Sequence, residues 1–502
     1  MTITMDHPSG YPGNEVSYRR FDDDASPLTE ADIPVRPENR TKTDRAFSFI
    51  MGGCIVIAIL FLLITFVIVI KHEPNRQSFN EAVMNEGGIS NQEEFQDFSF
   101  KKFAWKLTLT SFISLGLTII MAVLYRHATS FVVWGVLIIS WAYFFIVTVA
   151  LWWLNVDNII LKIIFTIVTV VLLCVLVFMK DKIRLVTMLF KEATKATFRM
   201  QAVFSVPAVT LLLLVIVWSI YIPATLYINF AGISSGSADS EYISGDFRIT
   251  AVIFNTIITI WISEFLVSIQ YMIVSGAVTK WYFTRNKELL GDPVYTSCYN
   301  TIKYHIGTAA LGSLIITIVA VLRAILRALS QHSRFRVLVN CCMARIEEFI
   351  RFFTKNAFIV TAMHGTPFIQ SGKRAVKLLT LNICNTITIN SLGDFVLTMS
   401  SVLIVGLSVL FAYFILGLQV EKSENIYGCI FFVVVIALIC CCTVLGTFET
   451  SFSTLFLCVC QDFLINNGIE KPYAMTRDLM EFLEDSKKTF AEKIEKKNLP
   501  KI

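Results

Sequence analysis

Long apolar segments recur along the whole chain and are separated by short polar stretches. Most of them reach about 20 residues, the length that an α-helix needs to cross a bilayer. Backbone polar groups inside lipid must be satisfied internally, and apolar runs of this length indicate helices. The pattern therefore predicts an all-α polytopic membrane protein with about ten transmembrane helices, at 46–70, 104–125, 129–154, 158–179, 202–230, 250–283, 304–322, 349–368, 392–418 and 426–447.

The segment at 349–368 is the least apolar of these. Residues 337–380 are amphipathic as a whole, and the sequence His364-Gly-Thr-Pro367 interrupts their apolar run. An even number of spans is needed to bring both ends of the chain to one side of the membrane. We therefore include this segment as the eighth span.

The distribution of charge predicts the orientation. Arg40, Lys42 and Arg45 precede the first span, whereas the following loop, 71–103, is rich in Glu and Asp. Because Lys and Arg accumulate on the cytoplasmic side of membrane proteins, the N-terminus is predicted to lie in the cytoplasm. The basic stretch 180–200 is predicted to form an amphipathic helix on the same surface.

Polar segments flank the apolar region. Residues 1–45 contain several prolines and an acidic run, and are predicted to be a disordered cytoplasmic tail. Residues 46–465 form the predicted transmembrane domain, and the charged segment 466–502 a cytoplasmic C-terminal tail. These features predict a multi-pass protein of the plasma membrane that has both termini in the cytoplasm and contacts membrane lipids.

The composition agrees with this class and offers no basis for an enzyme. Hydrophobic residues make up 55% of the 502 residues and charged residues only 16%, below the ~25% of soluble domains. Residues 365–373 resemble a phosphate-binding loop, but six residues separate its two glycines where that motif has four. His and Cys show no metal-site spacing on a polar loop. We predict no catalytic residue, metal, cofactor or nucleic-acid partner.

A carboxylate interrupts the sixth apolar segment near its middle. At about 100° per residue, Trp261, Glu264, Ser268 and Tyr271 share one face of a helix. A carboxyl group in hydrocarbon is costly unless it is paired, hydrogen-bonded or next to water, so this face is predicted to look inward. A negative charge beside aromatic rings suits an organic cation, because π faces attract ammonium groups. An interhelical hydrogen bond that holds the bundle together is the alternative, and the sequence does not decide between them.

Aromatic residues on two other spans extend the cation hypothesis. A quaternary ammonium has no hydrogen-bond donor, so several rings from at least two helices must enclose its methyl groups. Packing against neighbouring helices is the commoner role of a single ring. The predicted substrate site combines the inward face of the sixth span with rings from spans three and five, and consists of Trp141, Tyr143, Trp218, Tyr221, Trp261, Glu264, Ser268 and Tyr271.

Three other residues within the spans carry predictions. Pro207 and Pro223 lie in the fifth span, where proline kinks a helix and suits a cavity wall or a hinge. Asp394 is a second intramembrane carboxylate, but a polar stretch precedes it. We therefore expect Asp394 to cap the N-terminus of the ninth span.

Short motifs in the C-terminal third form a series. They are Lys355-Asn-Ala-Phe358, His364-Gly-Thr-Pro-Phe368, Gly372-Lys-Arg-Ala375, Gly393-Asp-Phe395, Leu455-Phe-Leu-Cys458 and Glu470-Lys-Pro-Tyr473. The sixth span contributes Trp261-Ile-Ser-Glu264 and Ser275-Gly-Ala-Val278. Together these motifs resemble the choline transporter-like family, and the resemblance extends over about residues 100–480.

The resemblance implies ten spans, both termini in the cytoplasm and sodium-independent movement of choline or ethanolamine. Glu264 would balance the ammonium charge of the substrate or exchange a proton. The leading hypothesis is therefore a secondary transporter or facilitator for choline-like organic cations. The alternative is a non-transporting membrane protein with a signalling, scaffold or lipid-handling role.

Overall fold

The computed structural model describes residues 39–71, 100–154, 158–230, 245–330, 336–380, 383–417, 423–466 and 474–481. Within these ranges the chain is helical and forms no strand, which confirms the predicted all-α class. Nine helices in the described part are long and apolar enough to cross a membrane. They belong to α1 (Arg45–Lys71), α4 (Phe100–His127), α5 (Thr129–Trp153), α6 (Ile159–Phe178), α8 (Ser205–Phe230), α9 (Gly245–Phe283), α11 (Ile306–Leu329), α14 (Ile383–Gly417) and α15 (Ser423–Ile465).

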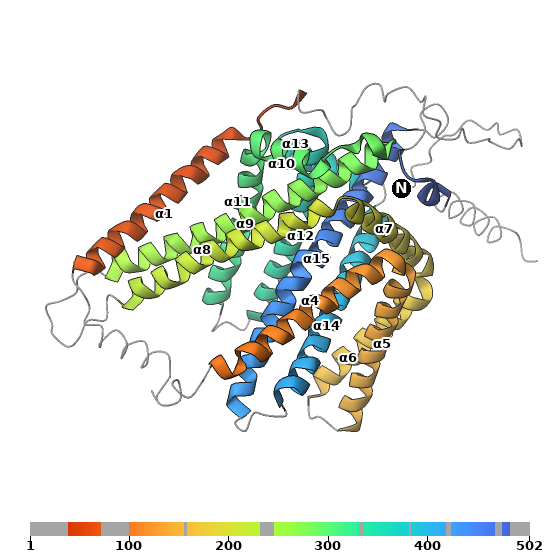
Figure 1. The fold of residues 1–502 in the computed structure, drawn as a ribbon, viewed down its shortest axis with the longest axis horizontal. Helices are drawn as coiled ribbons and strands as arrows, with labels where there is room; N and C mark the ends of the chain where they lie inside the picture. The colour runs from red at the N-terminus through yellow and green to blue at the C-terminus, as the bar shows by residue number, and fades with distance from the viewer. Residues whose placement is uncertain are drawn as a thin grey trace, which may run out of the picture.

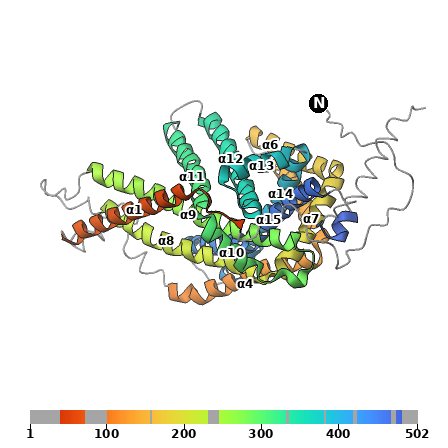
Figure 2. The ribbon, with the colours of Figure 1, turned by 90° about the horizontal axis from the view of Figure 1, so that it is seen from above.

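Two helices are long: α9 begins five residues before its predicted span (250–283), and α15 ends 18 residues after its own (426–447). α9 has 39 residues and α15 has 43, which at 1.5 Å per residue is about 60 Å, roughly twice the thickness of the hydrocarbon core. α9 packs against α1, α8, α10, α11, α12 and α15. Figures 1 and 2 show α1 and α8 on one side of the molecule and α6 and α7 on the other. α9 is thus the central helix that connects these parts of the bundle.

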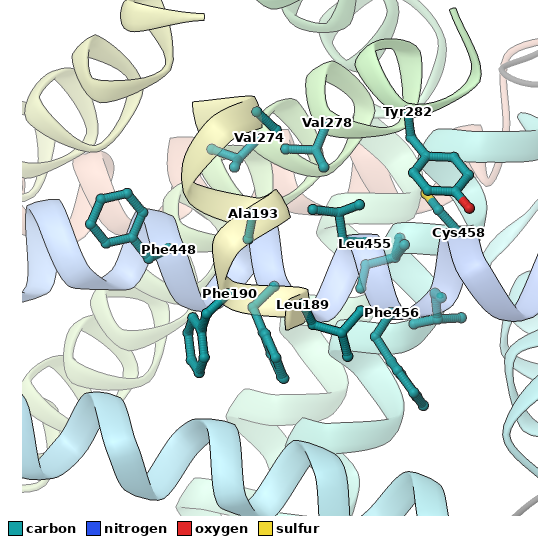
Figure 3. Close-up of a cluster of buried hydrophobic side chains, with 14 of the residues drawn as sticks. Leu189, Phe190, Ala193, Val274, Val278, Tyr282, Phe448, Leu455, Phe456 and Cys458 are labelled. Carbon is teal, nitrogen blue, oxygen red and sulfur yellow. The ribbon is translucent and has the colours of Figure 1, made fainter. Parts of the chain in front are cut away.

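Three shorter helices, α7 (Lys180–Arg199), α10 (Pro293–Tyr304) and α13 (Phe368–Thr380), lie at the same end of the bundle (Figure 1). The predicted amphipathic helix at 180–200 corresponds to α7. Its apolar face is buried, and the Phe190 ring stacks on Phe452 of α15 with ring centroids 4.4 Å apart. Figure 3 shows α7 side chains meeting residues of α9 and α15. α7 is therefore packed into the bundle as well as amphipathic.

α12 (Arg336–His364) covers most of the predicted eighth span, 349–368, but it begins well before residue 349 and ends before residue 368. It is absent from the nine apolar helices of the described part because of its charged side chains. The helix ends at the predicted interruption, His364-Gly-Thr-Pro367, where Gly365 adopts a positive φ of 68°, and α13 starts at Phe368. The charged residues of α12 are Arg336, Arg345, Glu347, Glu348, Arg351 and Lys355.

Two local predictions are wrong. Asp394 does not cap a helix, because the polar stretch before it is itself helical and Asp394 lies well inside α14. Pro207 does not kink the fifth span, because it lies in the first turn of α8, where proline is tolerated. Pro223 is inside α8, as expected.

Most of the predicted disordered N-terminal tail lies outside the described residues, but its last part is packed on the bundle. We call residues 40–44 the N-terminal strap. The Thr43 backbone N–H donates to the Tyr304 carbonyl at 2.9 Å, and its hydroxyl lies 2.9 Å from Nδ1 of His305. Asp44 accepts hydrogen bonds from the Thr308 hydroxyl at 2.7 Å and from the backbone N–H that begins α13 at 2.9 Å. The strap thus joins the starts of α11 and α13.

Arg40 completes the contacts of the strap. Its guanidinium lies 3.0 Å from Nε2 of His305 and donates to the Ala362 carbonyl at 2.7 Å. Burial lowers the pKa of His305 to about 3 and that of Arg40 to about 10. His305 is therefore neutral at pH 7, and its Nε2 accepts the hydrogen bond that Arg40 donates.

Gly307 is required by this packing. A Cβ atom at position 307 would lie 2.2 Å from the Asp44 carbonyl oxygen. We therefore expect Gly307→Ala to lower the free energy of unfolding by about 1–3 kcal/mol, the usual cost of overpacking, and to reduce the Tm in detergent. Gly135→Ala is the matched control, because nothing lies within 4 Å of that Cβ, and it should leave the Tm unchanged or raise it. Equal Tm values for the two variants would contradict the packing role of the strap.

Candidate functional site

Two groups of charged side chains lie between the helices. The first, which we call the ion ladder, consists of Glu264, Arg323, Glu347 and Arg351. The second, which we call the acidic cluster, consists of Tyr271, Lys355, Asp394 and Glu449. On α9 and α12 the members of the acidic cluster follow those of the ladder toward the end where α7, α10 and α13 lie. The two groups thus form successive layers along the bundle.

The ion ladder connects α9, α11 and α12. Arg351 donates Nη1 and Nη2 to the two carboxylate oxygens of Glu264 at 3.2 and 2.9 Å, a bidentate pair. Its Nε donates to Glu347 at 3.1 Å, and Glu347 accepts a further bond from Arg323 at 2.6 Å. Two arginines and two glutamates leave the ladder without net charge. It is therefore a neutral tie between three helices.

This geometry bears directly on the predicted role of Glu264. The carboxylate is 20% exposed and points toward α12, in agreement with the predicted inward face. Its charge is already balanced by Arg351, which favours the interhelical-tie alternative. The sequence contained a signal for this partner, because Glu347, Arg351 and Lys355 recur every four residues and share one face of α12.

The acidic cluster brings together four helices. The Lys355 ammonium of α12 donates to the Glu449 carboxylate of α15 at 2.6 Å and lies 5.8 Å from the ring centroid of Tyr271 on α9. Asp394 of α14 is exposed and lies within electrostatic range of both Lys355 and Glu449. With both carboxylates ionised, Lys355, Glu449 and Asp394 together carry one net negative charge; Glu348, which also lies within electrostatic range of Asp394, is balanced by Arg345.

Two side chains of the cluster are partly exposed although the cluster lies between helices. The side chains of Lys355 and Glu449 are 46% and 34% exposed, whereas Tyr271 is buried. A charged group at this depth is normally paired or faces a water-filled space, and such groups mark the paths of ions and substrates. The cluster therefore combines charged groups, two of them partly exposed, with a buried aromatic ring.

On the rest of the predicted α9 face, Trp261 joins two helices and Ser268 hydrogen-bonds within its own helix. Trp261 is buried, and its indole N–H lies 3.2 Å from the Ala310 carbonyl and 3.1 Å from the Ser313 hydroxyl, both on α11. Ser268 is buried and donates to the Glu264 backbone carbonyl at 2.8 Å, within α9. The Trp261 contacts fix α9 against α11, and Tyr271 is the ring of this face that lies near a cation, the Lys355 ammonium.

The predicted rings of span five approach α9, but on a different face. The Trp218 indole N–H donates to the Ser263 hydroxyl at 3.1 Å, and the Tyr221 hydroxyl lies 2.5 Å from the hydroxyl of Thr256. Ser263 is about 100° around the helix from Glu264. The structure therefore brings these rings to the helix but not to the face that carries the carboxylate.

The predicted rings of span three lie far from that face. Trp141 stacks on Phe145 with ring centroids 5.4 Å apart, and Tyr143 is 60% exposed. Both belong to α5, which packs against α6, α7 and α14. Figure 1 shows α5 on the opposite side of the molecule from α8. Trp141 and Tyr143 are thus not brought together with Tyr271.

The fold and these charged layers define a polytopic helical membrane protein with ionisable groups between its spans. The model of the family described as plasma-membrane choline transporter matches residues 163–463. The chain therefore belongs to the choline transporter-like family, which is a family of transporters and not of enzymes.

Curated relatives agree with this assignment. The chain is 30% identical to choline transporter-like protein 1 of Xenopus laevis over 421 residues, 76% of this chain and 64% of that protein. It is 29% identical to choline transporter-like protein 2 of Dictyostelium discoideum, over 64% of this chain and 54% of that protein. It is also 29% identical to choline transporter-like protein 3 of Homo sapiens, over 64% of this chain and 51% of that protein. The matched region thus spans less than two thirds of these relatives.

Proposed function

We propose that this protein moves choline or a related organic cation across the plasma membrane, and that the acidic cluster is its substrate site. The observation that carries the proposal is a cluster of four side chains from four helices, in which Lys355 contacts Glu449 and the Tyr271 ring and Asp394 lies within electrostatic range. Membership of the choline transporter-like family and the names of the relatives support it. The two carboxylates supply the charge that Glu264, paired with Arg351, does not.

A site of this kind suits an alkylammonium cation better than a metal ion. The face of Tyr271 attracts the polarised methyl or methylene groups around the nitrogen, and each such contact contributes about 0.5–2 kcal/mol. The carboxylates balance the charge of the ammonium cation. A small metal ion would in addition have to lose its tightly bound water. Ethanolamine, a primary ammonium, adds N–H donors that Glu449 and Asp394 accept.

The orientation and the coupling are part of the proposal. The basic helix α7 and the strap lie at the end of the bundle that we assign to the cytoplasm, by the positive-inside rule. We place both termini on that side as well; support comes from the last described segment, 474–481, whose Ala474 and Met475 backbone N–H groups donate to Asp462 at the same end. The exposed carboxyl of Asp394 is the group best placed for proton exchange. Lipids surround the large exposed apolar side chains of α5, α6 and α8.

Uptake of labelled choline into vesicles that contain only this purified protein tests the proposal. Saturable uptake, inhibited by unlabelled choline and absent from protein-free vesicles, is expected. A flat response to choline, ethanolamine and other organic amines would reject transport and favour the non-transporting alternative.

Tyr271 should set part of the affinity. Tyr271→Leu removes the ring but keeps an apolar side chain, so choline affinity should fall by about 2- to 30-fold, the equivalent of 0.5–2 kcal/mol. Tyr143→Leu on the far side of the bundle is the control, since that ring is 60% exposed and outside the cluster. The choline affinity of both variants is measured by competition of unlabelled choline against uptake of labelled choline. A larger loss for Tyr143→Leu would place the substrate elsewhere.

A further inference from the structure

The acidic cluster already holds an ammonium group. Lys355 Nζ lies 2.6 Å from a Glu449 carboxylate oxygen and 5.8 Å from the centre of the Tyr271 ring. The second distance is within the ~6 Å at which a cation is attracted by a ring. These are the two contacts that a substrate ammonium would make. Lys355 and the substrate therefore have overlapping positions.

We propose that Lys355 is a tethered stand-in for the substrate, an inference that rests on the proposed function. Its ammonium fills the cation position between Glu449 and Tyr271 when the site is empty, and the substrate displaces it. A lysine suits this role because its charge sits at the end of a flexible four-carbon chain. Asp394, within electrostatic range of Lys355 and Glu449 from a different helix, offers the displaced ammonium a second carboxylate.

The exchange also explains how an empty site can exist between helices. Without Lys355, the empty cluster would hold two like charges and no cation, which is unfavourable in a poorly hydrated place. With Lys355 in place it holds one net negative charge, and a bound substrate cation makes it neutral. The lysine thus keeps the empty state low enough in energy for the unloaded carrier to return across the membrane.

A simple interhelical salt bridge between α12 and α15 is the competing explanation of the same pair. In that case any neutral replacement would loosen the site, and arginine would conserve it. If Lys355 is a tethered competitor, a neutral replacement and arginine shift the choline affinity in opposite directions. Removing the tethered ammonium relieves competition with choline, whereas arginine binds a carboxylate bidentately and is harder to displace.

Two variants of the full-length protein separate these explanations. Binding of labelled choline to purified Lys355→Met should tighten by at least tenfold, and binding to Lys355→Arg should weaken by at least tenfold. Lys162→Met is the matched control. Lys162 also lies over a ring, 5.2 Å from the centre of Trp152, but it belongs to α6, which carries no residue of the acidic cluster. It should bind choline like the wild type.

Transport measurements should also distinguish a tethered competitor from a simple salt bridge. In vesicles, Lys355→Met should retain choline–choline exchange, in which the site is never empty as it crosses, and lose net uptake at least tenfold. Unchanged affinity and an unchanged ratio of exchange to net uptake in Lys355→Met would overturn the role of Lys355, as would weaker binding. Should Lys355→Met fail to fold, Lys355→Arg decides alone, and wild-type affinity in that variant overturns the proposal. Choline binding by the wild type is the separate test of the proposed function.

Discussion

Replacing Arg351 by methionine should destabilise this protein more than any other single change in the ion ladder. Methionine leaves Glu264 without a partner between the helices, and it removes one of the two arginines that hold Glu347. Breaking a buried pair by removal of one member costs about 3–5 kcal/mol. Arg351 is 37% exposed, so we expect a smaller loss, roughly 2–3 kcal/mol in the free energy of unfolding.

Thermal unfolding in detergent and the fraction of monodisperse protein measure this effect. Arg345→Met is the matched control on the same helix, because Arg345 and its partner Glu348 are 77% and 69% exposed. That change should stay within about 0.5 kcal/mol of the wild type. Adding Glu264→Gln to Arg351→Met should recover part of the loss, since the unpaired charge is then removed. A Tm for Arg351→Met equal to that of Arg345→Met would contradict the ladder.

The spans themselves could be predicted from the sequence because their cause is local. An apolar run of sufficient length forms a helix in lipid wherever it occurs, and α1, α5 and α6 begin and end within one residue of the predicted bounds. α12 was predicted only in part. Its charges mask its apolar face, and they are compensated by Glu264, Arg323 and Glu449 on other helices.

Pairing between distant segments could not be predicted. Arg351 follows Glu264 by 87 positions, and the strap residue Asp44 meets the start of α13 324 positions later. A single sequence predicts that Glu264 faces inward, but it does not predict which residue of another helix lies opposite Glu264. The same limit explains Asp394: the polar stretch before it is typical of a helix cap, but its electrostatic surroundings include Lys355 of α12 and Glu449 of α15.

The aromatic residues show which part of the site hypothesis depended on long-range information. Helical periodicity placed Tyr271 correctly two turns from Glu264 on one face of α9. Periodicity carries no information about which helices are neighbours, so the rings of α5 and α8 were grouped with that face by chemistry alone. The structure separates them, and it supplies Glu449 and Asp394 in their place.

The sharpest test of the site compares two glutamates that the sequence alone could not rank. Glu449→Gln keeps the size of the side chain and removes the charge that faces the cation position. Choline uptake per folded molecule should therefore fall at least 30-fold, the equivalent of about 2 kcal/mol. Asp394 remains near Lys355 in this variant, so the protein should fold.

Glu264→Gln should do the opposite. It breaks the bidentate pair with Arg351, so the amount of folded protein should fall, whereas uptake per folded molecule should stay within about threefold of the wild type. Glu288→Gln, at an exposed carboxylate in the turn after α9, controls for the substitution itself. Surface protein and initial uptake rates are measured on the same cells. If Glu264→Gln abolishes uptake at normal surface levels while Glu449→Gln transports normally, the counter-charge of the substrate is Glu264 and the acidic cluster is structural.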